Sequence, residues 1–298
     1  MTAAPRWTAY AALLFGACAI SMTPIWVRLA DAGPAAIGFW RLGLSAPILA
    51  VLMIVNRDAA SLTRPTLPGL LGGLFLCGDL ALWHYSLGFT SVTNATVLGN
   101  LAPIYVTIIG WLLFKERPKA LFLVGLAGAI AGAVIMALGG GKVSTPGPNP
   151  LLGDVLATLG AAWYAGYLLA TRAGRAKSTT SAIMFWSSLA GAVALLPVSL
   201  VLGERLLPAT GGGAWALVGL AATHVIGQGA IAWALGKLPT AVAAVTVLIQ
   251  PAFSGAIAWA LFGEVLTAQQ ILGGTIVLGA VVLAQWASAR RPQAPVTQ

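Results

Sequence analysis

The stretch that decides the fold runs from residue 79 to residue 116, DLALWHYSLGFTSVTNATVLGNLAPIYVTIIGWLLFKE, and it occurs twice in the chain. The second copy, GQGAIAWALGKLPTAVAAVTVLIQPAFSGAIAWALFGE, runs without a gap from residue 227 to residue 264, which is 148 positions later. A shared apolar composition would not keep the less common residues in step. Such residues nevertheless match in the pairs Pro103/Pro251, Trp111/Trp259 and Glu116/Glu264. We infer an internal duplication of the chain.

The composition predicts an integral membrane protein. Of the 298 residues, 59% are hydrophobic and only 8% are charged, which leaves too few polar side chains to cover a water-facing globule. The apolar runs are each about 20 residues long, the length that a helix needs to cross a bilayer. The formal charge of +9 is spread over short loops, so it indicates membrane topology and no nucleic-acid partner.

Ten apolar spans can be drawn along the chain. They cover residues 7–27, 34–55, 67–89, 93–114, 120–138, 151–171, 180–202, 214–236, 240–262 and 267–287. A linker rich in Gly and Pro, residues 139–150, lies where the two halves join. We therefore expect a first five-helix repeat over residues 1–138 and a second over residues 151–298.

Lysine and arginine are divided unequally between alternate loops. One side holds Arg6, Arg57, Arg64, Lys115, Arg117, Lys119, Arg172, Arg175, Lys177, Lys237, Arg290 and Arg291, and the other holds Arg28, Lys142 and Arg205. By the positive-inside rule, the richer side and both termini face the cytoplasm. Because five spans is an odd number, the second half enters the membrane from the opposite side. The predicted fold class is an all-α integral membrane protein with ten transmembrane helices as two five-helix inverted repeats, a plan typical of alternating-access transporters.

An ordered set of motifs resembles the EamA family of the drug/metabolite transporter superfamily. The set comprises Phe39-Trp40-Arg41 at the start of the second span, the run from Asn94 to Pro103 with Glu116, and its echo from Pro239 to Pro251 with Glu264. The resemblance covers residues 10–287, and exporters of aromatic amino acids are the nearest kind within the family. It implies export of amino acids or other small metabolites across a bacterial cytoplasmic (inner) membrane through a central cavity.

Asp79 is the first candidate for the substrate site, because it lies roughly 18 Å into its span and so near the midplane. An ionisable group at this depth is costly unless it faces protein or water. It either carries a proton or binds a substrate ammonium group, or it pairs with a neighbouring helix for packing. Arg41 lies about 10 Å below the end of its span, where it either binds a carboxylate or snorkels to the interface.

The remaining candidates lie on several spans around the same cavity. They are Trp83, His84, Asn100, Trp163, Tyr167, His224, Gln228 and Gln250. Trp163 and Tyr167 either stack on an aromatic or apolar substrate or pack in the core. His224 and Gln228 share a helix face at i and i+4, and a histidine there either relays protons or bonds the backbone. Pro103 and Pro251 each free a backbone carbonyl, so we predict a kinked hinge in each half.

Other functions are open to the same chain. A drug, lipophilic-cation or nucleoside exporter of the same fold is the nearest alternative, followed by a non-transporting membrane protein and an intramembrane protease. The chain has no G-x-S-x-G pentapeptide and only one deep aspartate, so we expect no enzyme. It has no Walker-type loop, so we expect no nucleotide, and no other cofactor or metal. The expected partners are a small-molecule substrate, the lipid bilayer and, where transport is coupled, protons; the chain is a monomer or a homodimer.

Overall fold

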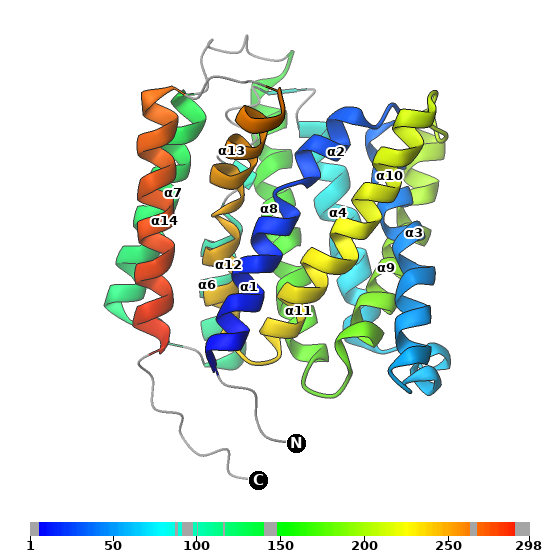
Figure 1. Cartoon of the computed structure of the whole chain (residues 1–298), viewed down its shortest axis with the longest axis horizontal. Coiled ribbons are helices and arrows are strands. Elements are labelled where there is room, and N and C mark those ends of the chain that lie inside the picture. The colour runs from blue at the N-terminus through cyan, green and yellow to red at the C-terminus, as the bar shows by residue number, and fades with distance from the viewer. Residues whose placement is uncertain are drawn as a thin grey trace.

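The computed structural model is a bundle of helices that run between two opposite ends of the molecule (Figure 1). It describes residues 6–86, 89–90, 98–99, 101–115, 117–139, 148–262 and 267–289, none of which lies in a strand. The helical segments are α1 (Arg6–Ile20), α2 (Thr23–Leu29), α3 (Pro34–Val55), η1 (Ala59–Thr63), α4 (Leu67–Ser86), α6 (Ala102–Phe114), α7 (Ala120–Gly139), α8 (Pro150–Gly174), α9 (Thr180–Val201), α10 (Gly211–Thr223), η2 (His224–Gln228), α11 (Gly229–Leu235), α12 (Thr240–Val247), α13 (Gln250–Phe262) and α14 (Ala268–Ala289).

The bundle has the helix lengths and the apolar surface that a bilayer requires. Within the described residues, six helices are long and apolar enough to cross a membrane, and they cover 7–27, 34–55, 67–86, 180–201, 211–235 and 268–288. Shorter apolar helices cover 102–113, 120–135 and 240–254. Large apolar side chains such as Val55, Leu112 and Trp215 are mostly exposed, which suits contact with lipid. The predicted all-helical membrane fold, ten helices in two five-helix inverted repeats, is confirmed.

Two of the predicted spans are divided near their middle. A turn at residues 21–22 separates α1 from α2, and a turn at residues 248–249 separates α12 from α13. Among the helices with a proline in the first turn are α2 with Pro24, α6 with Pro103 and α13 with Pro251. Proline suits this position because the first amides of a helix have no partner within it. Pro103 and Pro251 each lie at the start of a helical segment, and the hinges predicted at these two positions stay predictions.

The duplication is visible in the geometry of α3 and α9. Both helices have 22 residues, and each end of α9 lies 146 positions after the matching end of α3. Arg57 and Gly203, which are also 146 positions apart, follow the two helices with φ values of 59° and 64°. The same backbone turn therefore ends the second helix of each half.

Each of these two helices is tied to the loop that follows the other. The Trp40 indole in α3 donates to the carbonyl of Leu206 at 2.7 Å. The Trp186 indole in α9 donates to the carbonyl of Ser61 at 3.0 Å. Trp40 and Trp186 are again 146 positions apart, so the same tie occurs once in each half.

A carboxylate strengthens each tie, and we name the two contacts the Glu204 latch and the Asp58 latch. Glu204 accepts the amide N–H of Ala36 at 2.9 Å and that of Ala35 at 3.2 Å, and the Tyr85 hydroxyl also donates to it. The free amides at the start of a helix favour a negative charge. A Cβ atom at Gly33 would overlap the Glu204 side chain, so the glycine makes room for the latch.

The Asp58 latch is its counterpart, 146 positions earlier in the chain. Asp58 accepts the Ser61 hydroxyl at 2.6 Å, and the Thr179 hydroxyl also donates to it. Thr179 is the N-cap of α9, where its oxygen accepts the amide of Ala182 at 3.2 Å. The Asp58 latch thus reaches its helix through a threonine, whereas Glu204 binds the helix amides directly.

Helices α7 and α14 pack together at one side of the bundle, left in Figure 1. A Cβ atom added at Gly125 or Gly132 of α7 would lie within 3.0 Å of the α14 carbonyls of Ala280 and Gly273. The two backbones therefore lie close together, which is typical of small-residue interfaces in membranes. Away from this pair, the π-helical turn η2 contacts α1 and α3.

We predict that Glu204→Ala lowers the apparent melting temperature in detergent by roughly 5 °C, because the α3 amides and Tyr85 lose their acceptor. Tyr85→Phe removes only one of the three groups that donate to Glu204, so we expect it to lower the melting temperature by less. An unchanged melting temperature in Glu204→Ala would show that the latch does not hold α3.

Candidate functional site

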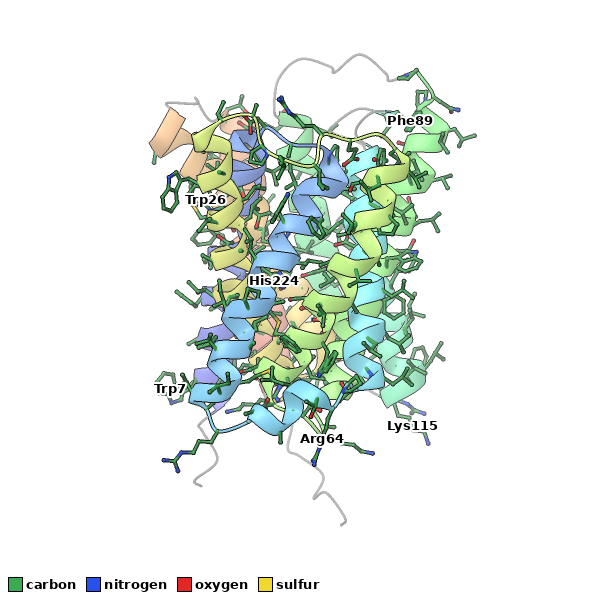
Figure 2. All side chains as sticks on the ribbon, turned by 90° about the vertical axis from the view of Figure 1, so that its right-hand side faces the viewer. Trp7, Trp26, Arg64, Phe89, Lys115 and His224 are labelled. Atoms are coloured by element: carbon green, nitrogen blue, oxygen red, sulfur yellow. The ribbon has the colours of Figure 1, made fainter. Side chains whose placement is uncertain are left out.

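Six polar side chains from the inner helices form what we call the central polar cluster. They are Arg41 of α3, Asp79 of α4, Tyr164 and Tyr167 of α8, and His224 and Gln228 of η2. Arg41 interacts electrostatically with Asp79 and both tyrosines, and also with His224. His224 lies about midway between the two ends of the bundle (Figure 2). His224 therefore lies at the depth at which a transporter of this plan holds its substrate.

Arg41 is buried, with only 9% of its surface exposed, and its Nε atom has no hydrogen-bond partner. Its carbonyl accepts the Ser45 hydroxyl at 2.6 Å, and the same hydroxyl lies 3.2 Å from the carbonyl of Ala221 in α10. Ser45 thus positions the Arg41 turn of α3 against α10. Of the two roles predicted for Arg41, snorkelling to the interface does not occur in this structure, because the side chain is buried.

Asp79 lies one residue after Gly78, and this glycine determines how α4 meets α8. A Cβ atom at Gly78 would overlap the Trp163 ring, so the ring occupies the space that the glycine leaves. The carboxylate of Asp79 is partly exposed and interacts electrostatically with Arg41. Within the described part of the chain, no hydrogen bond or close ion pair joins the two side chains.

His224 and Gln228 lie in a π-helical turn, where the sequence predicted an ordinary α-helix. Both side chains are buried, at 0% and 2% exposure. His224 Nε2 lies 3.2 Å from the Ser188 hydroxyl of α9, whereas His224 Nδ1 and Gln228 Oε1 have no partner. Gln228 also hydrogen-bonds the Tyr164 hydroxyl. Single π turns of this kind are frequent at functional sites, because they widen the helix and redirect its side chains.

The aromatic residues of α8 divide between packing and the cluster. Trp163 packs edge-on against Phe75, with ring centroids 5.5 Å apart, and lies against Gly78. Tyr164 and Tyr167 stack on each other at 6.0 Å, and the Tyr167 hydroxyl points to the sulfur of Met184 at 3.7 Å. The sequence named Trp163 and Tyr167 but not Tyr164. Tyr164 could have been found from its position three residues before Tyr167, because residues three apart lie on the same face of a helix.

The other predicted site residues are not among the six side chains of this cluster. His84 interacts electrostatically with Arg41 and with Glu204, and it bonds the carbonyl of Pro34, while its Nδ1 is unpartnered. Trp83 is partly exposed and contacts the Gly99 position with its indole. Gln250 is partly exposed at the start of α13. Asn100 lies outside the described residues.

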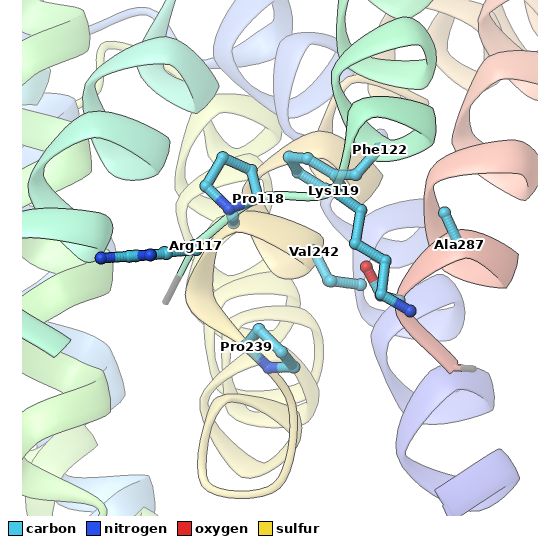
Figure 3. Close-up of a pocket in the computed structure, with 9 residues that line it drawn as sticks. Arg117, Pro118, Lys119, Phe122, Pro239, Val242 and Ala287 are labelled. Atoms are coloured by element: carbon cyan, nitrogen blue, oxygen red, sulfur yellow. The ribbon is translucent and has the colours of Figure 1, made fainter. Parts of the chain in front are cut away.

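A cavity lies at the end of the bundle that carries Arg64 and Lys115, which we call the basic end (Figures 2 and 3). Its volume is about 30 Å³, room for roughly one water molecule. It is lined by Arg117, Pro118, Lys119, Phe122, Pro239, Ala241, Val242, Ala287 and Ser288. It contains none of the predicted site residues.

Comparison with known proteins identifies the family. Residues 7–138 and residues 151–286 each match the EamA-like transporter family. The chain belongs to this family. An "Uncharacterized transporter" of Archaeoglobus fulgidus is 27% identical over 290 residues, which cover 92% of this chain and 95% of that protein. "Pseudopaline exporter CntI" of Pseudomonas aeruginosa is 24% identical over 240 residues, 78% of this chain and 80% of that one.

A solved crystal structure shares the fold of this EamA transporter. It superposes with a TM-score of 0.79 at 18% sequence identity and covers 94% of this chain and 98% of its own. In the fold so established, the central polar cluster offers a cation, a carboxylate and several neutral groups within one buried region. Within the described residues, no group of three or more His, Cys, Asp or Glu side chains is placed to hold a metal ion.

We predict that Arg41→Met leaves the apparent melting temperature unchanged or raises it. A buried cation with an unpartnered Nε costs desolvation free energy that an apolar side chain does not. Leu42→Ala, at a neighbouring position with 0% exposure, is the control that should lower the melting temperature by opening a cavity. If Arg41→Met lowers the melting temperature as much as Leu42→Ala does, Arg41 serves the packing of the bundle.

Proposed function

We propose that this EamA transporter exports small metabolites, amino acids first among them, by alternating access. The observation that carries the proposal is the central polar cluster, in which buried side chains at mid-depth keep unpartnered Arg41 Nε, His224 Nδ1 and Gln228 Oε1 atoms. An unpartnered polar atom in a dry interior is unfavourable. A polar ligand that supplies the missing partners removes that cost, which makes the cluster a binding site.

The direction of transport is inferred from the loop charges and from the relatives. Among the described loops, the basic end carries Arg57, Arg64, Lys115, Arg117, Lys119, Arg175, Lys177 and Lys237. The positive-inside rule places this end in the cytoplasm of a bacterial cell. The relative in Pseudomonas aeruginosa is named as an exporter, which supports outward movement here.

The divided helices supply the places where the bundle can bend. The turns at residues 21–22 and 248–249 each interrupt a predicted span. The first turn is bonded to α13, the segment that follows the second turn, because the Ser254 hydroxyl donates to the Ser21 carbonyl at 2.8 Å. The latched helices α3 and α9 form the frame against which these segments move. Hinges at such turns would open the cluster to one side of the membrane at a time.

We predict that the purified protein in liposomes exchanges amino acids in a counterflow assay. Gln228→Ala should reduce the exchange rate at least about tenfold, because it removes a buried polar contact to the ligand. Gln269→Ala, at an exposed position of α14, is the matched control and should leave the rate unchanged. Exchange of nucleosides or lipophilic cations without any amino acid would contradict the assignment to amino acids.

Protons are the proposed coupling ion, with Asp79 as the group that carries them. We predict that Asp79→Asn folds and abolishes the dependence of transport on pH. An amide neither binds nor releases a proton over the pH values of the assay. The measurement is the initial rate of uptake into proteoliposomes as external pH is varied. A pH profile identical to that of the wild type would remove Asp79 from coupling.

A further inference from the structure

The last turn of α4 is bonded to the first turn of α3, and we call these contacts the α3–α4 lock. The Tyr85 hydroxyl donates to Glu204, the carboxylate that binds the amides at the start of α3, and His84 bonds the carbonyl of Pro34. Pro34 is the first residue of α3, which runs from there toward Arg64 at the basic end (Figure 2). The α3–α4 lock therefore lies at the opposite end of the bundle, which we call the outer end.

A second contact joins α8 to α11 at the basic end, and we call it the α8–α11 lock. The Arg172 guanidinium, in the last turn of α8, donates through Nη1 to the carbonyl of Leu235 at 2.7 Å. Leu235 is the last residue of α11, and the free carbonyls at the end of a helix favour a positive charge. The two locks therefore lie at opposite ends of the bundle and join different pairs of helices.

Each lock joins two segments that carry the central polar cluster. The α3–α4 lock joins the helix of Arg41 to the helix of Asp79. The α8–α11 lock joins the helix of Tyr164 to the helix that directly follows Gln228, and these two side chains are hydrogen-bonded to each other. Separation of either helix pair would therefore part side chains of the cluster.

The cluster lies between the two locks along the helix axes. Pro34 precedes Arg41 by seven residues, which is about 10 Å along α3 toward the outer end. Arg172 follows Tyr164 by eight residues, which is about 12 Å along α8 toward the basic end. Each lock is thus at a similar distance from the cluster, on the path to one side of the membrane.

Both locks are formed in this structure, and the cluster between them is buried. Arg41, His224 and Gln228 are 9%, 0% and 2% exposed. Alternating access requires one end to open while the other stays closed. We propose that the two locks are the gates of the transporter, so that breaking the α3–α4 lock opens the cluster to the outer end and breaking the α8–α11 lock opens it to the basic end. This inference rests on the proposed alternating access.

The α3–α4 lock has no copy in the second half of the chain. By the offset of 148, His84 and Tyr85 of α4 correspond to Ala232 and Trp233 of α11. Alanine has no side-chain group that donates or accepts a hydrogen bond. The Trp233 ring lies beneath the Lys237 ammonium group, with Nζ 3.6 Å from the ring centroid. The two gates therefore use different residues, and a single substitution can weaken one of them alone.

The test uses a cysteine at the cluster as a reporter of opening. Ser188 is 0% exposed and hydrogen-bonded to His224, and Ser188→Cys is made in a protein whose Cys18 and Cys77 are replaced by alanine. The measurement is the rate at which a membrane-impermeant thiol reagent modifies this cysteine in the absence of substrate. Intact cells expose the outer end to the reagent, and inverted membrane vesicles expose the basic end.

Tyr85→Phe is expected to raise the modification rate about tenfold in cells and not in inverted vesicles, because the outer gate loses a hydrogen bond to a charged group. Arg172→Met is expected to do the reverse for the same reason. Ser61→Ala removes a hydroxyl that donates to the other latch carboxylate within one turn of the chain, and Lys177→Met removes an exposed positive charge at the basic end. Both of these controls should keep the rates of the parent protein.

Unchanged rates in both folded gate variants, or equal increases on both sides, would overturn the assignment of the gates while alternating access stands. An equal increase in the controls would overturn it too. If Tyr85→Phe does not fold, Glu204→Gln tests the outer gate, and if Arg172→Met does not fold, Arg172→Gln tests the basic one. Modification from neither side in the parent and in every folded variant would contradict alternating access itself, and with it the proposed function.

Discussion

Hydrocarbon offers no hydrogen bonds to a broken helix, and this constraint shapes the inner half of the bundle. Where a helix stops at mid-depth, the backbone groups that it frees need partners inside the protein. The Ser21 carbonyl, at the turn between α1 and α2, accepts the Ser254 hydroxyl of α13 at 2.8 Å. The π turn η2 leaves His224 and Gln228 buried on the inside. The irregular segments therefore face the centre, and the centre becomes polar.

The two halves share a frame and differ at the site. Asp58 and Glu204, like Trp40 and Trp186, lie 146 positions apart and tie α3 and α9 at both ends of the bundle. Arg41 corresponds by the same offset to Ser187, and Asp79 corresponds by the offset of 148 to Gly227 in η2. The frame that ties α3 and α9 is therefore symmetric, whereas the polar residues at the centre are not.

The sequence predicted the fold closely because hydropathy and capping signals are local. The span predicted at 34–55 coincides with α3, which begins at Pro34 after Gly33. Arg41, Asp79, His224 and Gln228 were candidates from the sequence because polar side chains are rare within apolar spans, and their role in binding stays a prediction. The π turn could not be predicted, since hydropathy reports burial and not the hydrogen-bond spacing of a helix. The Glu204 latch joins residues that are more than 160 positions apart, so no local pattern reveals it.

The central claim is that the polar cluster opens alternately to the two sides of the membrane. Ser188 is 0% exposed and hydrogen-bonded to His224, so a reagent reaches this position only when the cluster is open. Ser188→Cys, in a protein whose Cys18 and Cys77 are replaced by alanine, would be treated with a membrane-impermeant thiol reagent from one side and, separately, from the other. The account predicts modification from both sides. Modification from one side only, or from neither, in a variant that still transports would contradict it.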